Sequence, residues 1–166
     1  MPTTRHASAG ILADANSAKR EEIVALLTKA YWMEMETVMN YLAISSHLDG
    51  VRAEEIAGAL AADVDEELGH AKLFAGRIKD LYGTPPGSLD FAAEQGYLQP
   101  PADATDVVTA INGVIEAEAG AIEHYTRIIE ACDGVDWATQ DMVIDILRDE
   151  ENHLRTFERY LKEFDS

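Results

Sequence analysis

Two Glu-x-x-His pairs are the residues of this sequence whose types and spacing could do chemistry. They are Glu67 with His70 and Glu150 with His153. On a helix, an offset of three places the carboxylate and the imidazole on one face, about one turn apart. Both side chains can then reach one point, and carboxylate oxygen with imidazole nitrogen is a ligand set that binds first-row metals. Each pair is therefore a candidate metal-ligating unit.

Each pair is preceded by a glutamate that lies in an apolar helical stripe. Glu34 shares its stripe with Ile23, Leu27, Ala30, Val38, Tyr41 and Leu48. Glu118 shares its stripe with Ile111, Val114, Ile115, Ile122, Tyr125 and Ile129. Spacings of three, four and seven assign both glutamates to a buried face. Glu36 and Glu116 fall on polar faces and are predicted to be solvated.

The two halves of the chain repeat this arrangement. Glu34 is followed by Glu67 after 33 residues, and Glu118 is followed by Glu150 after 32 residues. A tyrosine also stands seven residues after each stripe glutamate, at Tyr41 and Tyr125. We interpret the repeat as a duplicated helical hairpin. Each tyrosine is either a core residue or lies close enough to the glutamate two turns away for a hydroxyl hydrogen bond to a carboxylate or for redox involvement.

The negative charge of the buried glutamates has to be compensated by cations. Four buried carboxylates carry −4, and no lysine or arginine shares the central part of the stripes. Uncompensated burial would cost several kcal/mol per group. Two divalent cations supply the balance, and oxygen-rich ligation with one imidazole per metal suits iron or manganese better than zinc. The predicted catalytic and metal-ligating residues are Glu34, Glu67, His70, Glu118, Glu150 and His153.

Two further carboxylates are expected to orient the histidines. A ligating histidine usually donates its other ring N–H to a carboxylate or a carbonyl. Asp149 and Glu66 each stand one residue before a ligand glutamate, so we predict that Asp149 contacts His70 and that Glu66 contacts His153. The remaining histidines are predicted to be surface or boundary residues: His6, His47 and His124.

Four long helical segments must position these residues. They are expected from residue 16 or 17 to 50, from 52 to 82, from 103–106 to 134, and from 136 to 164. Each has about 28 to 32 residues, roughly 42–48 Å of helix. A Gly/Pro-rich connection, 84–102, separates the halves and contains a short amphipathic piece at 89–95. Two short connections and one long crossover predict an all-α, ferritin-like four-helix bundle. We expect an N-terminal tail at 1–16 and the bundle domain at 17–166.

Composition limits the possible partners. The 31 acidic and 13 basic residues give a net charge of −18, which disfavours nucleic acid and anionic membrane surfaces and favours cations. A single cysteine excludes an intrachain disulfide, a thiolate zinc site and an iron–sulfur cluster. The N-terminus lacks an apolar core of signal-peptide length, so a cytoplasmic location is expected.

Four stretches resemble the ferritin-like di-iron superfamily, in particular bacterioferritins and bacterioferritin-related Dps-like proteins. They are EMETVMNYLAI, DEELGHAKLFAGRI, EAEAGAIEHY and VIDILRDEENHLRTFERYL, and the resemblance covers residues 19–164. It implies the same six ligands, with Glu67 and Glu150 as bridges between two iron ions. It also implies a ferroxidase that oxidises Fe(II) with oxygen or peroxide and stores or detoxifies the ferric product, often in a hollow homo-oligomeric shell.

The sequence departs from this family at informative positions. Leu68 stands where bacterioferritins carry a haem-ligating methionine, which implies that haem is absent. Only 13 residues follow His153, too few for a fifth helix. A 12-subunit shell, a 24-subunit shell and a smaller assembly all stay open. So do three other functions: a manganese catalase, a di-iron oxygenase, and a Dps-like DNA-protecting shell.

Overall fold

The computed structural model describes residues 7–164, in which four long α-helices carry the fold. The helices are α1 (Ser17–His47), α2 (Val51–Asp80), α3 (Val107–Cys132) and α4 (Trp137–Leu161). Two short 3-10 helices, η1 (Asp14–Asn16) and η2 (Ser88–Asp90), lie outside them, and the described residues contain no strand. The all-α prediction is confirmed. None of these helices is long and apolar enough to span a membrane.

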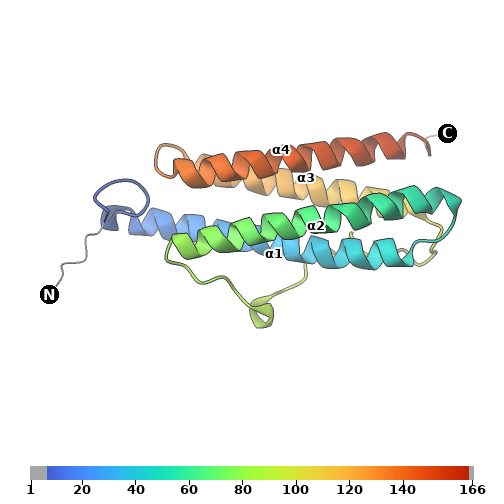
Figure 1. Cartoon of the computed structure of the whole chain (residues 1–166), viewed down its shortest axis with the longest axis horizontal. Coiled ribbons are helices and arrows are strands. Elements are labelled where there is room, and N and C mark those ends of the chain that lie inside the picture. Colours follow the sequence, from blue (N-terminus) through green and yellow to red (C-terminus); the bar gives the residue numbers. More distant parts are fainter. Residues whose placement is uncertain (1–6, 165–166) are drawn as a thin grey trace.

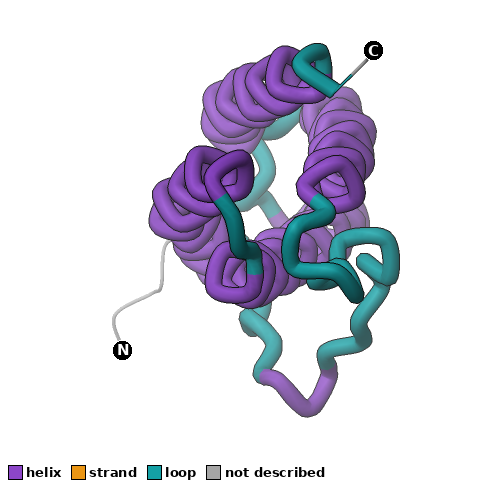
Figure 2. The backbone as a smooth tube through the Cα atoms, turned by 90° about the vertical axis from the view of Figure 1, so that its right-hand side faces the viewer, coloured by secondary structure: helices purple, strands orange, loops and turns teal. Residues whose placement is uncertain are grey.

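The helices form two antiparallel hairpins joined by a long crossover (Figure 1). The crossover, residues 81–106, runs along the outside of the bundle (Figure 2). It returns the chain to the other end of the molecule, so α3 runs parallel to α2 and antiparallel to α1 (Figure 1). The predicted ferritin-like arrangement is confirmed. At 26 and 25 residues, α3 and α4 are shorter than expected. Capping explains where they begin, because the side chains of Asp106 and Asp136 accept backbone N–H groups from Thr109 and Thr139.

The apolar core is divided into two clusters along the bundle axis. One cluster contains the first half of α1 and the second half of α3, for example Ile23, Leu27 and Ile128. The other contains the second half of α1 and the first half of α3, for example Ile44 and Ile111. Glu34 and Glu118 fall between these segments. The middle of the bundle is therefore a buried polar layer with apolar packing on both sides.

A buried polar network joins the end of α2 to the start of α4. Arg77 Nη2 lies 2.8 Å from Asp136 Oδ1, and Arg77 Nε donates to Thr139 Oγ1 at 2.7 Å. The Asp136 side chain is 1% exposed and the Arg77 side chain 16%. Asp136 therefore both caps α4 and neutralises a largely buried guanidinium.

We predict that Asp136→Ala lowers the free energy of unfolding by about 3–5 kcal/mol, because it leaves Arg77 buried without its partner. Urea denaturation of the metal-free protein measures this loss. Asp106→Ala is the matched control, since Asp106 caps α3 facing solvent and should cost only about 1 kcal/mol. Equal losses in the two variants would show that the Arg77 contact adds nothing.

Candidate metal centre

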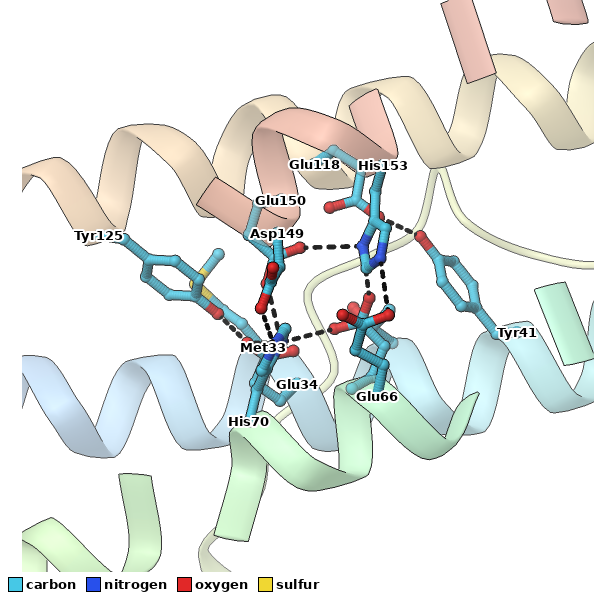
Figure 3. A network of polar contacts seen from close by, with 12 residues as sticks. Met33, Glu34, Tyr41, Glu66, His70, Glu118, Tyr125, Asp149, Glu150 and His153 are labelled. Carbon is cyan, nitrogen blue, oxygen red and sulfur yellow. Dashed lines mark hydrogen bonds and ion pairs between the residues drawn. The ribbon is translucent and has the colours of Figure 1, made fainter. Parts of the chain in front are cut away.

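All four long helices contribute to a cluster in the polar layer (Figure 3). Each of its six residues is at most 5% exposed. The structure thus brings together every residue that the sequence singled out as a ligand: Glu34 of α1, Glu67 and His70 of α2, Glu118 of α3, and Glu150 and His153 of α4.

The cluster consists of two overlapping groups. In each group, one ligand atom per residue lies within 4.8 Å of the others. The first group is Glu34, Glu67, His70 and Glu150; the second is Glu67, Glu118, Glu150 and His153. Glu67 and Glu150 belong to both. Two cation positions bridged by two carboxylates are the arrangement that this overlap can support.

Both histidines turn Nδ1 toward the carboxylates. His70 Nδ1 lies 3.1 Å from Glu150 Oε1 and 3.6 Å from Glu67 Oε2. His153 Nδ1 lies 3.3 Å from Glu67 Oε1 and 3.4 Å from Glu150 Oε2. The pseudo-repeat seen in the sequence is therefore present in the geometry, with each half supplying one imidazole to the same pair of glutamates.

The opposite ring nitrogens contact carboxylates outside the cluster. His70 Nε2 lies 3.3 Å from Asp149 Oδ2, and His153 Nε2 lies 3.3 Å from Glu66 Oε2. These are the two contacts predicted from the sequence. Each crosses between α2 and α4, so each histidine is oriented by the helix that it faces.

We predict that Asp149→Ala weakens binding of the metal ion on the His70 side by roughly 10–100-fold, because that ring loses its orienting acceptor. Calorimetric titration of metal-free protein with Co(II) measures the affinity. Asp145→Ala, an exposed carboxylate on the same helix, is the control. Unchanged affinity and stoichiometry in Asp149→Ala would remove the orienting role.

Two buried tyrosines donate to the outer glutamates in a crossed pattern. Tyr41 of α1 donates to Glu118 of α3, and Tyr125 of α3 donates to Glu34 of α1. Figure 3 shows the two rings approaching the cluster from opposite ends. Each tyrosine thus donates to the glutamate of the neighbouring helix and not to the glutamate seven residues before it on its own helix. The antiparallel course of α1 and α3 brings each tyrosine to the other glutamate.

Burial and mutual repulsion raise the pKa of the outer glutamates. Burial, followed by the charges of Glu67 and Glu150, raises the pKa of Glu34 well above its ordinary value. Burial and the same two charges raise the pKa of Glu118. Burial also pushes the pKa of Glu67 upward, but its contacts with His153 and His70 outweigh this, and the pKa is lowered.

The histidines show the complementary effect. Burial disfavours their charged form, but the carboxylates of Glu150 and Glu67 overcome it. They raise the pKa of His70 to about 10 and that of His153 to about 12. In the metal-free protein, protons on the imidazoles therefore offset part of the negative charge of the cluster.

Four buried atoms of the cluster indicate that a metal ion would fit among the six side chains. Glu67 Oε1, His70 Nδ1, Glu150 Oε1 and His153 Nδ1 are buried and make no hydrogen bond of normal geometry; they meet only as the ion pairs His70–Glu150 and His153–Glu67. Unsatisfied buried polar atoms are rare and costly. All four belong to the shared centre of the two groups, where a cation would coordinate them. Carboxylate-rich ligation with one imidazole per position suits iron or manganese.

Two residues of the predicted surface are buried instead. Glu36 is only 6% exposed, and its carboxylate accepts the backbone N–H groups of Glu94 and Gln95 at 2.8 Å. The prediction that Glu36 is solvated was wrong, because a polar helical stripe does not reveal that another segment's amides take the place of water. His124 is also buried, with a ring nitrogen 2.9 Å from the Leu26 carbonyl oxygen.

Two further residues predicted at the surface are exposed. His47 is exposed and contacts the Pro101 carbonyl oxygen at 2.8 Å, and Glu116 is exposed as predicted. His6 lies outside the described residues.

Sequence reasoning missed one residue beside the cluster. Gln95 of the crossover is 4% exposed and forms part of the wall of a small cavity that borders Glu34, Glu67, Glu118 and Glu150. The cavity has a volume of about 10 Å³, roughly the room for one water. Only its place at the end of the short amphipathic piece could have signalled a buried role.

Comparison with known proteins identifies the family. Residues 24–166 match the Ferritin family model, described as a ferritin-like domain. The chain is 26% identical over 141 residues to a bacterioferritin of Desulfovibrio desulfuricans, covering 84% of this chain and 74% of that protein. It is 30% identical over 146 residues to a DNA protection during starvation protein of Pyrococcus furiosus, covering 85% of this chain and 77% of that protein.

Solved structures share the fold. The bacterioferritin-related protein of Bacteroides fragilis, described as a dodecameric thioferritin, superposes with a TM-score of 0.75 at 24% identity and 87% coverage of both chains. The bacterioferritin of Desulfovibrio desulfuricans superposes with a TM-score of 0.75 at 23% identity, covering 89% of this chain and 84% of that one. With its crossover bundle and its carboxylate–histidine cluster, the chain belongs to the ferritin-like family.

Proposed function

We propose that this protein is a ferroxidase of ferritin type, which takes up Fe(II) as substrate and oxidises it in pairs. One observation carries the proposal: two carboxylate–histidine groups share Glu67 and Glu150, and four of their buried atoms make no hydrogen bond. Two adjacent positions with a common pair of carboxylates suit a two-electron oxidation. Two Fe(II) ions supply two electrons, which with two protons reduce oxygen to hydrogen peroxide, or hydrogen peroxide to two waters.

The chain's own residues position the substrate and balance its charge. Glu34 with His70 and Glu118 with His153 would each hold one Fe(II), and Glu67 and Glu150 would bridge them. The four carboxylates neutralise two divalent ions. Tyr41 and Tyr125 fix the outer glutamates, and the apolar clusters on both sides keep the site from bulk water.

Two of the three alternatives fit this protein less well. A cavity of about 10 Å³ beside the cluster has no room for the organic substrate of an oxygenase. The relative from Pyrococcus furiosus is named for DNA protection, but a net charge of −18 disfavours direct contact between this chain and a phosphate backbone. A manganese catalase would use the same set of ligands, so measurement has to distinguish catalase activity from ferroxidase activity.

Iron storage, a homo-oligomeric shell and a cytoplasmic location belong to the same proposal. The dodecameric relative from Bacteroides fragilis supports a shell of 12 subunits, and a shell of 24 or a smaller assembly remains the alternative. Acidic residues outside the cluster would attract Fe(II) toward such an assembly. Leu68 supports a protein without haem.

Oxidation of Fe(II) in air tests the proposal. Addition of Fe(II) to the metal-free protein should produce ferric absorbance much faster than the same addition to buffer. Metal uptake without accelerated oxidation would contradict ferroxidase activity. Rapid oxygen release from hydrogen peroxide by the manganese-loaded protein would instead assign it as a catalase.

Metal uptake should also release protons, and its affinity should rise with pH. The pKa values of His70 and His153 are raised to about 10 and about 12, so both imidazoles carry an additional proton and are positively charged at neutral pH. Metal binding requires the neutral imidazole, so at least one proton per metal ion is displaced. Calorimetry with Co(II) in buffers of different ionisation enthalpy measures the number. Proton-independent binding would exclude the two histidines as ligands.

A further inference from the structure

A small cavity lies beside the cluster on the side of α1 and α3. Apart from the candidate ligands and Tyr125, the small cavity is bounded by α1, α3 and the crossover, through Met33, Thr37, Gln95, Ala117 and Ala121. On the α2–α4 side the two imidazoles stand against the cluster, with Asp149 and Glu66 behind them (Figure 3). The cavity therefore faces the seam between α1 and α3.

A larger hollow lies on the outside of the same seam. It has a volume of about 250 Å³, and Met33 and Gln95 line both it and the inner cavity. We call it the outer hollow; its charged lining residues are Lys29, Glu36, Glu94, Glu123 and Arg127. Three carboxylates against two cationic groups leave it with a net negative charge. Met33 and Gln95 therefore form part of the wall that separates the outer hollow from the candidate ligands.

The Gln95 side chain is held in this wall by hydrogen bonds to α1 alone. Its Nε2 donates to Thr37 Oγ1 at 2.8 Å and to the Met33 carbonyl oxygen at 3.3 Å. Its Oε1 accepts from Asn40 Nδ2 at 3.0 Å. None of these partners is a candidate ligand. Gln95 therefore borders the cluster without holding any of the six side chains in place.

The backbone around Gln95 is anchored on both sides. Glu36 accepts the N–H groups of both Glu94 and Gln95, which fixes the segment to α1. On the α3 side, a Cβ on Gly113 would lie 2.6 Å from the Tyr97 carbonyl oxygen, so the segment packs directly against the α3 backbone. Rotation of one side chain is accordingly an easier way to open the wall than displacement of the crossover.

We propose that the Gln95 side chain closes a passage from the outer hollow to the metal centre and sets the rate at which divalent cations pass. This inference rests on the proposed function, because it requires that metal ions occupy the cluster. It assigns Gln95 a role in kinetics: the side chain controls uptake and release without contributing to affinity.

Stopped-flow uptake of Co(II) by the metal-free protein tests the role without any oxidation step. Gln95→Ala should raise both the association and the dissociation rate at least several-fold, with affinity and stoichiometry unchanged. Gln99→Ala is the matched control. Gln99 is an exposed glutamine of the same segment that donates to Asn40 and to the Gln95 carbonyl oxygen and lines neither space. Its rates should equal those of the wild type.

A reversible block sharpens the test. Gln95→Cys should also speed uptake, and methylthiolation of that thiol should restore the length of the side chain and slow uptake again until a reductant is added. Cys132, the only native cysteine, is fully buried, and burial raises the pKa of its thiol to about 12, so the label goes to position 95.

Three results would overturn the inference. Uptake rates in Gln95→Ala equal to wild type would place the route elsewhere. Altered affinity or stoichiometry would make Gln95 part of the metal site. Insensitivity of Gln95→Cys to the label would exclude closure by this side chain. A wild-type protein that binds fewer than two Co(II) per chain would instead contradict the proposed function, and this inference would fall with it.

Discussion

Glu34→Gln should lower the rate of Fe(II) oxidation by at least roughly 100-fold, more than the loss of an orienting group usually costs. Glu34 is the one carboxylate that belongs solely to the His70 group, so its loss removes a ligand from one of two positions. Paired oxidation needs both positions, and one bound Fe(II) supplies only one electron. Stopped-flow absorbance under air measures the rate, and metal analysis should find less than two ions per chain.

The same variant should fold at least as well as the wild type. The raised pKa of Glu34 means that its proton is held more tightly in the folded than in the unfolded protein, so this group destabilises the metal-free fold as pH rises above the ordinary glutamate range. Glutamine resembles the protonated carboxyl and removes this effect. The stability of the variant relative to wild type should therefore increase with pH.

Two matched variants complete the test. Glu118→Gln should give the same loss through the His153 group. Glu116→Gln, an exposed glutamate on the same helix, changes the net charge equally and should oxidise Fe(II) as the wild type does. Full oxidation by Glu34→Gln would show that the cluster is not the site of the reaction.

Removal of each metal ion should cost about 4 kcal/mol of stability when the loading ion is present at 1,000 times its dissociation constant. Two bound cations would relieve the repulsion of four buried carboxylates and would coordinate four buried atoms that make no hydrogen bond. For a domain of this size each ion corresponds to a shift of roughly 8–16 °C in the melting temperature. Calorimetric scans of chelator-treated and Mn(II)-loaded protein measure it.

A comparison with Ca²⁺ distinguishes stabilisation by ions bound at the cluster from screening of the net charge of −18. Ca²⁺ prefers six to eight oxygen ligands and would not use the imidazoles, so at equal ionic strength it should give a much smaller shift. Equal shifts with Mn(II) and Ca²⁺ would mean that surface screening, not the cluster, stabilises the protein.

The sequence was sufficient to predict the bundle and the six clustered side chains for a simple physical reason. Helical periodicity determines which residues share a face, and a charged residue on an apolar face needs a compensating partner. Glu34 and Glu118 stand out by that rule, and the repeated Glu-x-x-His pairs supply the partners. The contacts of Asp149 with His70 and of Glu66 with His153 followed from the same reasoning.

The crossover was less predictable. Its path depends on backbone groups, and nothing in the pattern of α1 shows that Glu36 receives two amides of residues 94 and 95 instead of water. The burial of Gln95 follows from that contact. The crossed donation by Tyr41 and Tyr125 likewise depends on the antiparallel alignment of α1 with α3, which periodicity within one helix does not specify.

The central claim is that the six side chains bind two Fe(II) per chain and oxidise them as a pair. Stepwise anaerobic addition of Fe(II) to the metal-free protein, followed by mixing with oxygen, tests it most directly. We predict that the amplitude of the fast ferric absorbance rises linearly and breaks at two Fe(II) per chain. A break at one Fe(II), or the absence of a fast phase, would contradict the account.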